Sequence, residues 1–246
     1  MTTPKEGTLV SERHGILDTI LESLAPVHRD GHKFIAIAAG AALLFFVIWP
    51  PLGWVFVILA LCIAYFFRDP DRVTPMRDGL IIAAADGTIS SIESVVPPVE
   101  LGLGSDRRVR ISTFLSVLNV HITRAPVAGR IVRSIYVPGT FVNAALDKAS
   151  EENERRAMII ERTDGVEVAV VQIAGLVARR IVPFVHEGDS VGVGERLGLI
   201  RFGSRVDVYL PVGRTALVSV GQTAIGGETV LADLASTEQE RFARRN

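Results

Sequence analysis

The sequence has little that would support a disulfide, a metal site or a nucleic-acid interface. Its single cysteine, Cys62, cannot form a disulfide within the chain. Because Cys62 lies in an apolar run, we expect a buried and unreactive thiol. No cysteine and histidine cluster has metal-ligand spacing, and neither standard glycine-rich phosphate loop is present. The 26 basic and 27 acidic residues nearly cancel, which gives no reason to expect nucleic acid as a partner.

Charge is also absent from one long stretch, residues 34–67, which starts too late and runs too long for a secretory signal peptide. One bilayer crossing needs about 20 residues, and this run is longer. Pro50 and Pro51 interrupt it near the middle, beside Trp49 and Trp54, and tryptophan favours membrane interfaces. We therefore expect a membrane hairpin of two short helices. Whether its arms cross the whole bilayer is left open.

The flanks of this run indicate the topology and the domain boundaries. Basic residues on both sides place both ends in the cytoplasm: Arg29, Lys33, Arg68, Arg72 and Arg77. Within the N-terminal segment 1–33, residues 11–24 have the spacing of an amphipathic helix, which can dock on the membrane or on the protein's own domain; its proximity to the hairpin favours the membrane. After the hairpin we expect a linker at 68–79, a β-rich domain at 80–232 and a charged tail at 233–246.

Short β-type runs broken by glycine, proline and aspartate fill the second half of the chain. They predict a mostly β fold, a β-sandwich or barrel-like domain, with strands near 80–84, 88–95, 107–113, 129–137, 157–162, 166–174 and 177–182. Two more runs, 199–202 and 206–210, flank the dipeptide Gly203-Ser204. The second run alternates apolar and polar residues, which predicts a half-buried strand. Taken alone, Gly203-Ser204 would be interpreted as a turn or bulge.

Several blocks of the sequence together resemble the short, bacterial-type phosphatidylserine decarboxylases, a family of self-cleaving, pyruvoyl-dependent proenzymes. The blocks follow the family's order: RDPDR at 68–72, ADGTI at 85–89, FLSVLNVHITRAPVAGRI at 114–131, NAALDKASEENER at 143–155 and EGDSVGVGERLGLIRFGSRVD at 187–207. The resemblance covers residues 29–211, and its motifs are specific in combination.

The resemblance implies that the protein cleaves its own peptide bond between Gly203 and Ser204. A serine hydroxyl can attack the preceding carbonyl, and glycine leaves that carbonyl unshielded. Ser204 would become a covalent pyruvoyl cofactor at the start of a small fragment, 204–246, whose partner is the large fragment, 1–203. A Schiff base between this ketone and phosphatidylserine would allow loss of CO2 and release of phosphatidylethanolamine.

The resemblance also implies roles for three further residues. Asp86 and His121 occupy catalytic positions, and the chemistry fits, since a serine needs a base and the base needs an orienting carboxylate. Outside the family context, Asp86 before Gly87 would mark a turn, and His121 would be a core histidine. Arg124 lies where longer-type enzymes have a second histidine, which leaves open how His121 divides cleavage and decarboxylation. Its guanidinium suits a lipid phosphate or carboxylate, so Arg124 is a substrate-binding candidate.

The same resemblance implies that the protein is located in the bacterial inner membrane, with its catalytic domain on the cytoplasmic side. Its partners would be the bilayer and phosphatidylserine. The oligomeric state is left open. The alternative is a non-enzymatic lipoyl-like or membrane-fusion adaptor, because Asp147-Lys148-Ala149 resembles a lipoyl-lysine turn. That alternative leaves Gly203-Ser204, Asp86 and His121 unexplained. The intact mass separates the two, since an adaptor stays one chain of 26.6 kDa and the enzyme splits in two.

Overall fold

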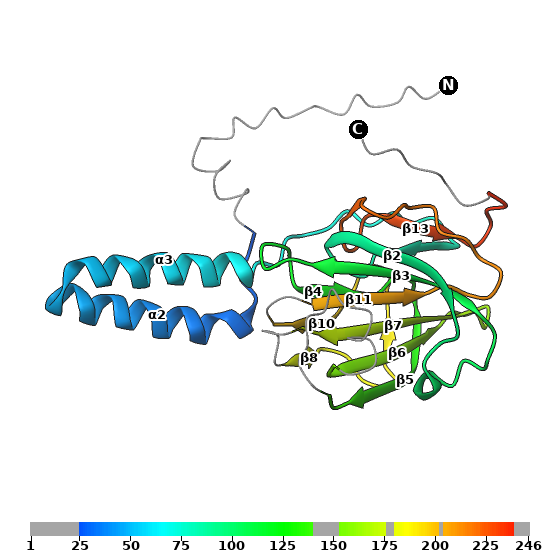
Figure 1. Ribbon diagram of the computed structural model, residues 1–246, viewed down its shortest axis with the longest axis horizontal. Helices are drawn as coiled ribbons and strands as arrows, with labels where there is room; N and C mark the ends of the chain where they lie inside the picture. Colours follow the sequence, from blue (N-terminus) through cyan, green and yellow to red (C-terminus); the bar gives the residue numbers. More distant parts are fainter. Residues whose placement is uncertain (1–24, 140–152, 176–179, 202–203, 239–246) are drawn as a thin grey trace, which may run out of the picture.

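A computed structural model of the chain describes residues 25–139, 153–175, 180–201 and 204–238 (Figure 1). The predicted amphipathic helix at 11–24, the lipoyl-like turn around Lys148, most of the block at 143–155, and Gly203 itself lie outside the described residues.

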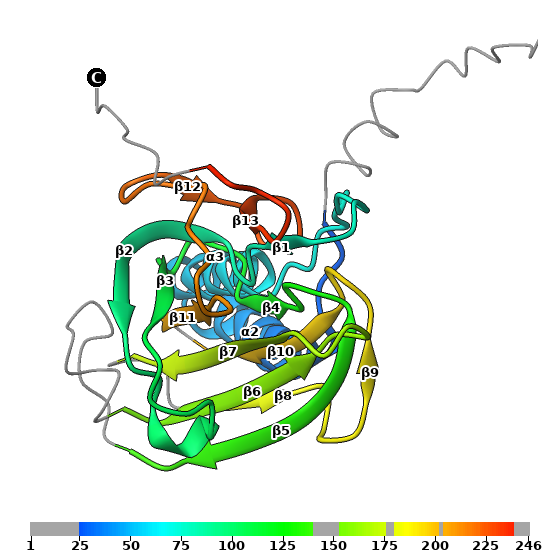
Figure 2. The ribbon, with the colours of Figure 1, turned by 90° about the vertical axis from the view of Figure 1, so that its right-hand side faces the viewer.

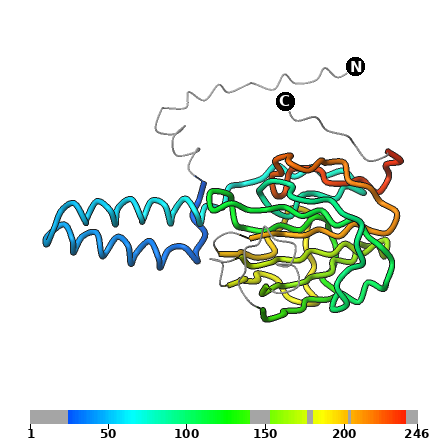
Figure 3. Tube along the Cα trace, viewed as in Figure 1, coloured from blue at the N-terminus to red at the C-terminus, as the bar shows by residue number. Residues whose placement is uncertain are grey.

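Two antiparallel helices project from one side of the β-rich domain, which confirms the expected helical hairpin (Figures 1 and 3). Helix α2 spans Arg29–Ile48 and α3 spans Pro50–Phe66, with Trp49 between them. Pro50 and Pro51 occupy the first turn of α3, where a missing N–H leaves no helical hydrogen bond unmade. By length and composition α2 could cross a membrane, whereas α3 is a shorter apolar helix.

Helix α2 begins five residues before the uncharged run, because the side chain of His28 caps it by accepting a hydrogen bond from Asp30 N at 3.3 Å. At about 1.5 Å per residue, α2 is about 30 Å long, the thickness of a bilayer's hydrocarbon core. The arm is therefore longer than the sequence suggested.

Within the described part of the chain, many large apolar side chains of the hairpin are exposed, among them Leu43, Trp54 and Leu61. The expectation of a buried thiol is wrong, because Cys62 is exposed on α3. Two glycines let the helices approach closely. A Cβ on Gly31 would lie 2.6 Å from Phe67 Cβ, and one on Gly53 would lie 2.7 Å from the ring of Phe46.

Hydrogen bonds join the two ends of the hairpin where it meets the domain. His28 N donates to Phe67 O at 2.8 Å, and Asp69 N donates to Pro26 O at 2.7 Å. The chain therefore leaves the hairpin beside the point where it entered.

The β domain consists of one large sheet and two small ones, which confirms the mostly β prediction. Its strands are β1 (Leu80–Ile82), β2 (Gly87–Val95), β3 (Arg108–Leu115), β4 (Ile122–Arg124), β5 (Gly129–Val137), β6 (Arg155–Glu161), β7 (Glu167–Ala174), β8 (Ile181–Pro183), β9 (Ser190–Val191), β10 (Arg196–Ile200), β11 (Ser204–Tyr209), β12 (Thr223–Ala224) and β13 (Val230–Asp233). The large sheet has the order β12-β2-β3-β11-β7-β6-β5-β9, and the small ones are β4-β10-β8 and β1-β13. Figure 2 shows the large sheet curling into a half-barrel.

Strand β11 lies near the centre of the large sheet, and all six of its residues are buried. The expectation of a half-buried strand is wrong, because both faces are covered. One face belongs to the main core, and the other packs under the 3-10 helix η1 (Val99–Leu101) and its neighbours. The polar residues Arg205 and Asp207 on that second face neutralise each other, with Nε and Oδ1 at 2.9 Å.

Candidate active site

Ser204 is the first residue of β11 and lies between Leu115 of β3 and Ala174 of β7. Its side chain is fully buried, and its Oγ has no hydrogen-bond partner among the described residues. Leaving a buried hydroxyl unpaired costs about 1–3 kcal/mol, so such a group calls for an explanation, and a catalytic role is one. Ser204 therefore presents an uncommitted nucleophile in a site closed to solvent.

His121 immediately precedes β4 and is also fully buried. Its ring lies 4.2 Å from the ring of Phe66, centroid to centroid, at the end of α3. Its Nδ1 lies 2.9 Å from the carbonyl oxygen of Asn119. Because a carbonyl can only accept, Nδ1 must carry the proton, and in the neutral imidazole Nε2 then carries the lone pair.

Burial lowers the pKa of His121 to about 4, and the nearby charge of Arg68 acts in the same direction. The imidazole is therefore neutral at pH 7, the state in which it can accept a proton. The Asn119 hydrogen bond opposes part of this shift by favouring the protonated ring.

Strands β11 and β4 begin at the end of the domain from which the hairpin projects (Figure 1). Ser204 is the first residue of β11 and His121 precedes β4, so both belong to this end. Strand β3 ends at Leu115 opposite Ser204, and the chain reaches His121 after the turn 116–119. On the other side, Ile200 at the end of β10 donates its N–H to His121 O at 3.2 Å. Ser204 Oγ is nevertheless not hydrogen-bonded to His121 in this structure.

Asp86 immediately precedes β2 near the same end of the sheet. Its Oδ2 accepts from Arg72 Nη2 at 2.8 Å, and its Oδ1 accepts from Gly226 N at 2.8 Å. Gly87 has φ of 156°, and a Cβ there would lie 2.1 Å from Phe114 O, so the Asp-Gly pair reflects close contact between β2 and β3. The carboxylate of Asp86 thus binds Arg72 and Gly226, and the carbonyl of Asn119, not Asp86, holds His121 Nδ1.

Arg124, in β4, is buried and uses its guanidinium within the protein. It donates to Asp69 Oδ1 at 3.1 Å, to Pro70 O at 2.9 Å and to Gly194 O at 3.1 Å. These contacts fix the segment that leaves the hairpin, and a lipid headgroup would have to displace them to bind here.

The RDPDR segment at 68–72 connects the hairpin to each of these residues. Arg68 Nη2 donates to Leu118 O at 2.7 Å in the turn before His121, Asp69 binds Arg124, and Arg72 binds Asp86. The expected linker is therefore held against the domain along its first half. The sequence marks this motif, but it does not predict that Arg72 and Asn119 hold Asp86 and His121. The clue available was the density of charge, four ionic residues in five, so close to the membrane.

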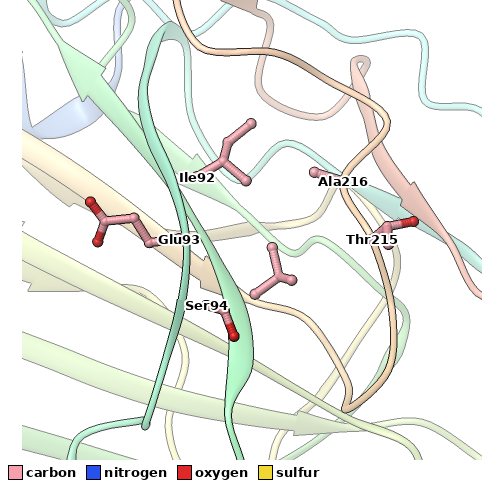
Figure 4. A pocket seen from close by; sticks show the side chains of 6 residues that line it. Ile92, Glu93, Ser94, Thr215 and Ala216 are labelled. Atoms are coloured by element: carbon pink, nitrogen blue, oxygen red, sulfur yellow. The ribbon is translucent and has the colours of Figure 1, made fainter. Parts of the chain in front are cut away.

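A small hollow of about 130 Å³ elsewhere on the domain offers no comparable chemistry (Figure 4). Among the described residues that line it, Glu93 alone is ionisable, and its carboxylate points away from Thr215 and Ala216 to pair with Arg110. Within the part of the chain that the structure describes, no three His, Cys, Asp or Glu residues are grouped as a metal site.

Comparison with known proteins agrees with the family that the sequence motifs resemble. The profile of the family described as phosphatidylserine decarboxylase matches residues 59–232. A protein of Cereibacter sphaeroides named phosphatidylserine decarboxylase proenzyme is 56% identical over 225 residues, which are 92% of this chain and 97% of the relative. A protein of the same name from Nitrobacter winogradskyi is 55% identical over 224 residues, 91% of each chain.

Proposed function

The chain belongs to the phosphatidylserine decarboxylase family, and from this premise we propose that it converts phosphatidylserine to phosphatidylethanolamine and CO2 with a pyruvoyl group made from its own Ser204. It is an enzyme of this type, which sets aside the lipoyl-like adaptor considered from the sequence. The observation that carries the pyruvoyl proposal is the buried, unpartnered Oγ of Ser204 at the start of a central strand.

Self-cleavage would begin with attack of Ser204 Oγ on the carbonyl carbon of Gly203. A C–O bond forms, the C–N bond breaks, and the hydroxyl proton passes to His121 and then to the departing amide nitrogen. Loss of the Ser204 α-proton then expels the Gly203 carboxylate and leaves dehydroalanine. Addition of water and loss of ammonia give the ketone. Two features support this route: the neutral state of His121 and its location at the same end of the sheet.

The residues around Ser204 fit the group that this chemistry would leave there. Leu115 and Ala174 flank the position, and Phe66 covers His121, so bulk water is excluded. The ketone supplies an electrophile for the substrate amine and a sink for the electron pair left by CO2. His121 remains the candidate for moving protons in both stages, and Asp86 keeps its catalytic assignment from the resemblance.

The hairpin supports binding of the substrate at the membrane surface. Its apolar surface and the basic residues at both ends support insertion into the bacterial inner membrane, with the β domain on the cytoplasmic side. The hydrogen bonds between entry and exit support placing both ends on one side. Cysteine labelling of sealed vesicles at positions 10 and 80 checks this, and labelling from opposite faces would refute the topology.

The decisive experiment compares the purified protein with Ser204→Ala by intact mass under denaturing conditions and by release of CO2 from phosphatidylserine. We expect the native chain to give two fragments, 1–203 and 204–246, the second blocked at its N-terminus. Ser204→Ala should give one chain of about 26.6 kDa without activity. Cleavage of Ser204→Ala at this bond, or CO2 release from it, would refute the mechanism.

A further inference from the structure

Two apolar side chains stand exposed at the tip of the turn 116–119. Val117 is 54% exposed and Leu118 is 69% exposed. Single exposed aliphatic residues are common, but these two face the C-terminal half of α3 across a groove of about 530 Å³. The groove is lined by α3 residues between Ile58 and Phe66, by Phe67, and by Val117 and Leu118.

Several polar groups of the turn are hydrogen-bonded within the protein, while its apolar tip is exposed. Asn119 Oδ1 accepts from Ser116 N at 2.8 Å and from Ser116 Oγ at 2.7 Å, and Asn119 N donates to Ser116 O at 3.0 Å. The carbonyl of Leu118 accepts from Arg68 at 2.7 Å. Satisfying backbone groups in this way is what contact with hydrocarbon requires.

Arg68 marks the polar rim of this groove. Its guanidinium lies 3.9 Å from the ring centroid of Tyr65 and donates to Tyr65 O at 2.8 Å as well as to Leu118 O. An arginine held at the end of an apolar helix lies naturally at headgroup depth, with its stem along apolar surface. The groove therefore runs from a cationic rim into a surface made of aliphatic and aromatic side chains.

The inner end of the groove reaches the candidate active site. Phe66 lines the groove, and its ring lies against that of His121 at a tilt of 36°, with centroids 4.2 Å apart. Asn119, which closes the turn, also holds His121 Nδ1 through its carbonyl. The same short segment thus presents an apolar tip to its outside and orients the imidazole on its inside.

We propose that the groove between α3 and the turn 116–119 binds one acyl chain of the phospholipid substrate, and that Val117 and Leu118 dip into the acyl region of the same leaflet. The groove is continuous with the apolar face of α3, and the positive charge of Arg68 at its rim suits an anionic headgroup. The turn would then contact the membrane in addition to helices α2 and α3. Binding of the lipid would in this way be linked to the position of His121. This inference rests on the proposed function and its membrane hairpin.

The depth of the turn can be measured with a single tryptophan. Trp49→Phe and Trp54→Phe remove both native tryptophans, and Leu118→Trp then places the only indole at the tip. In vesicles of phosphatidylserine and phosphatidylcholine with brominated acyl chains, we expect its emission to be blue-shifted and quenched. The matched control is Val99→Trp in the same background. Val99 is 92% exposed and lies in η1, beyond the end of β2 that is remote from Ser204, so its emission should stay unquenched.

Either of two results would overturn the proposal. Unquenched, red emission from Leu118→Trp would place the turn in water. Unquenched but blue-shifted emission would mean that protein covers the tip, either a second copy or residues 1–24.

Acyl-chain binding has a separate kinetic signature. Leu118→Gln should lower the ratio of kcat/KM for long-chain over dihexanoyl phosphatidylserine roughly tenfold, or about 1.4 kcal/mol, because an apolar contact with the acyl chain is lost. Val99→Gln should leave the ratio unchanged. An unchanged ratio in Leu118→Gln would refute chain binding in the groove. Intact mass confirms that the variant has folded and cleaved itself, and a failure of cleavage in the native chain would refute the proposed function without affecting the quenching result.

Discussion

At the scale of single residues, the charge state of His121 decides what the site can do. A fully buried imidazole with its Nδ1 proton held by Asn119 can accept a proton through Nε2 at neutral pH. Its low pKa makes it a weak base but leaves it in the proton-accepting form, which is the form that the proposed role in self-cleavage needs.

The pH dependence of self-cleavage should therefore follow the low pKa of His121. Because the neutral form is the active one, cleavage should persist from pH 7 to pH 5 and fall as the pH drops through about 4. A solvent-exposed histidine would lose activity near 6.5. Cell-free translation followed by transfer to buffers between pH 4 and 8 measures the rate, and a midpoint near 6.5 would contradict a buried base.

Linkage gives the same group an effect on stability. The pKa of His121 is lower in the folded protein than in the unfolded chain, so the unfolded chain binds the proton first as the pH falls. The contribution of His121 to the free energy of unfolding is therefore fully present above pH 6.5. It is lost as the pH falls from 6.5 to about 4.

Arg72 is the residue whose function is tied most directly to Asp86. If the Asp86 carboxylate acts in cleavage, Arg72→Ala should accumulate uncleaved precursor, because it removes the 2.8 Å ion pair. Arg72→Lys should restore part of the cleavage by keeping the charge while losing the planar geometry. Arg77→Ala is the control, since Arg77 is more exposed and pairs with Asp233 instead. Densitometry of precursor and fragments on a gel measures the outcome. Equal cleavage in all three variants would show that the ion pair of Asp86 with Arg72 plays no part in the reaction.

At the scale of elements, the sequence predicted the helical hairpin and most strands because their signals are local. Proline in the middle of an apolar run and glycine between β-type runs act on neighbouring residues. The burial of β11 could not be seen this way, because alternation in Arg205 and Asp207 does not show that a second layer covers them. The ion pairs Arg124–Asp69 and Arg72–Asp86 could not be predicted either, because the chain has many charged residues and only the fold determines which of them meet. Ser204 and His121 were found through family resemblance, not through periodicity.

The base of the hairpin provides a prediction about helix contact. Gly31→Ala would place a methyl group 2.6 Å from Phe67 Cβ, so we expect overpacking that costs about 1–3 kcal/mol. Because Phe67 adjoins Phe66, whose ring contacts that of His121, cleavage should slow as well. Gly40→Ala is the matched control on the same helix, because a Cβ on Gly40 would meet nothing within 4 Å and alanine favours helix by about 1 kcal/mol. Thermal unfolding in detergent compares the two, and equal midpoints would show that the helices separate freely.

At the scale of the whole molecule, the RDPDR segment unites hairpin and domain. It pairs with the hairpin's entry through Asp69 N and Pro26 O, and with the domain through Arg124 and Asp86. The last strand, β13, ends at Asp233, which pairs with Leu80 of β1. The domain's first and last strands are thus neighbours.

This arrangement predicts that the two fragments stay together after cleavage. The small fragment contributes β11, whose six residues pair with β3 on one side and β7 on the other, together with β12 on β2 and β13 on β1. It also buries Val206, Val208 and Leu231 in the main core, each worth about 1.5–3 kcal/mol. The proposed break precedes β11 and removes only the N–H of Ser204, so the ladder pairing of residues 205–209 with β3 and β7 is spared. A C-terminal tag should therefore retain the large fragment through purification in mild detergent and release it only in denaturant. Loss of the large fragment under native conditions would mean that β11 is not held by its neighbours as the structure indicates.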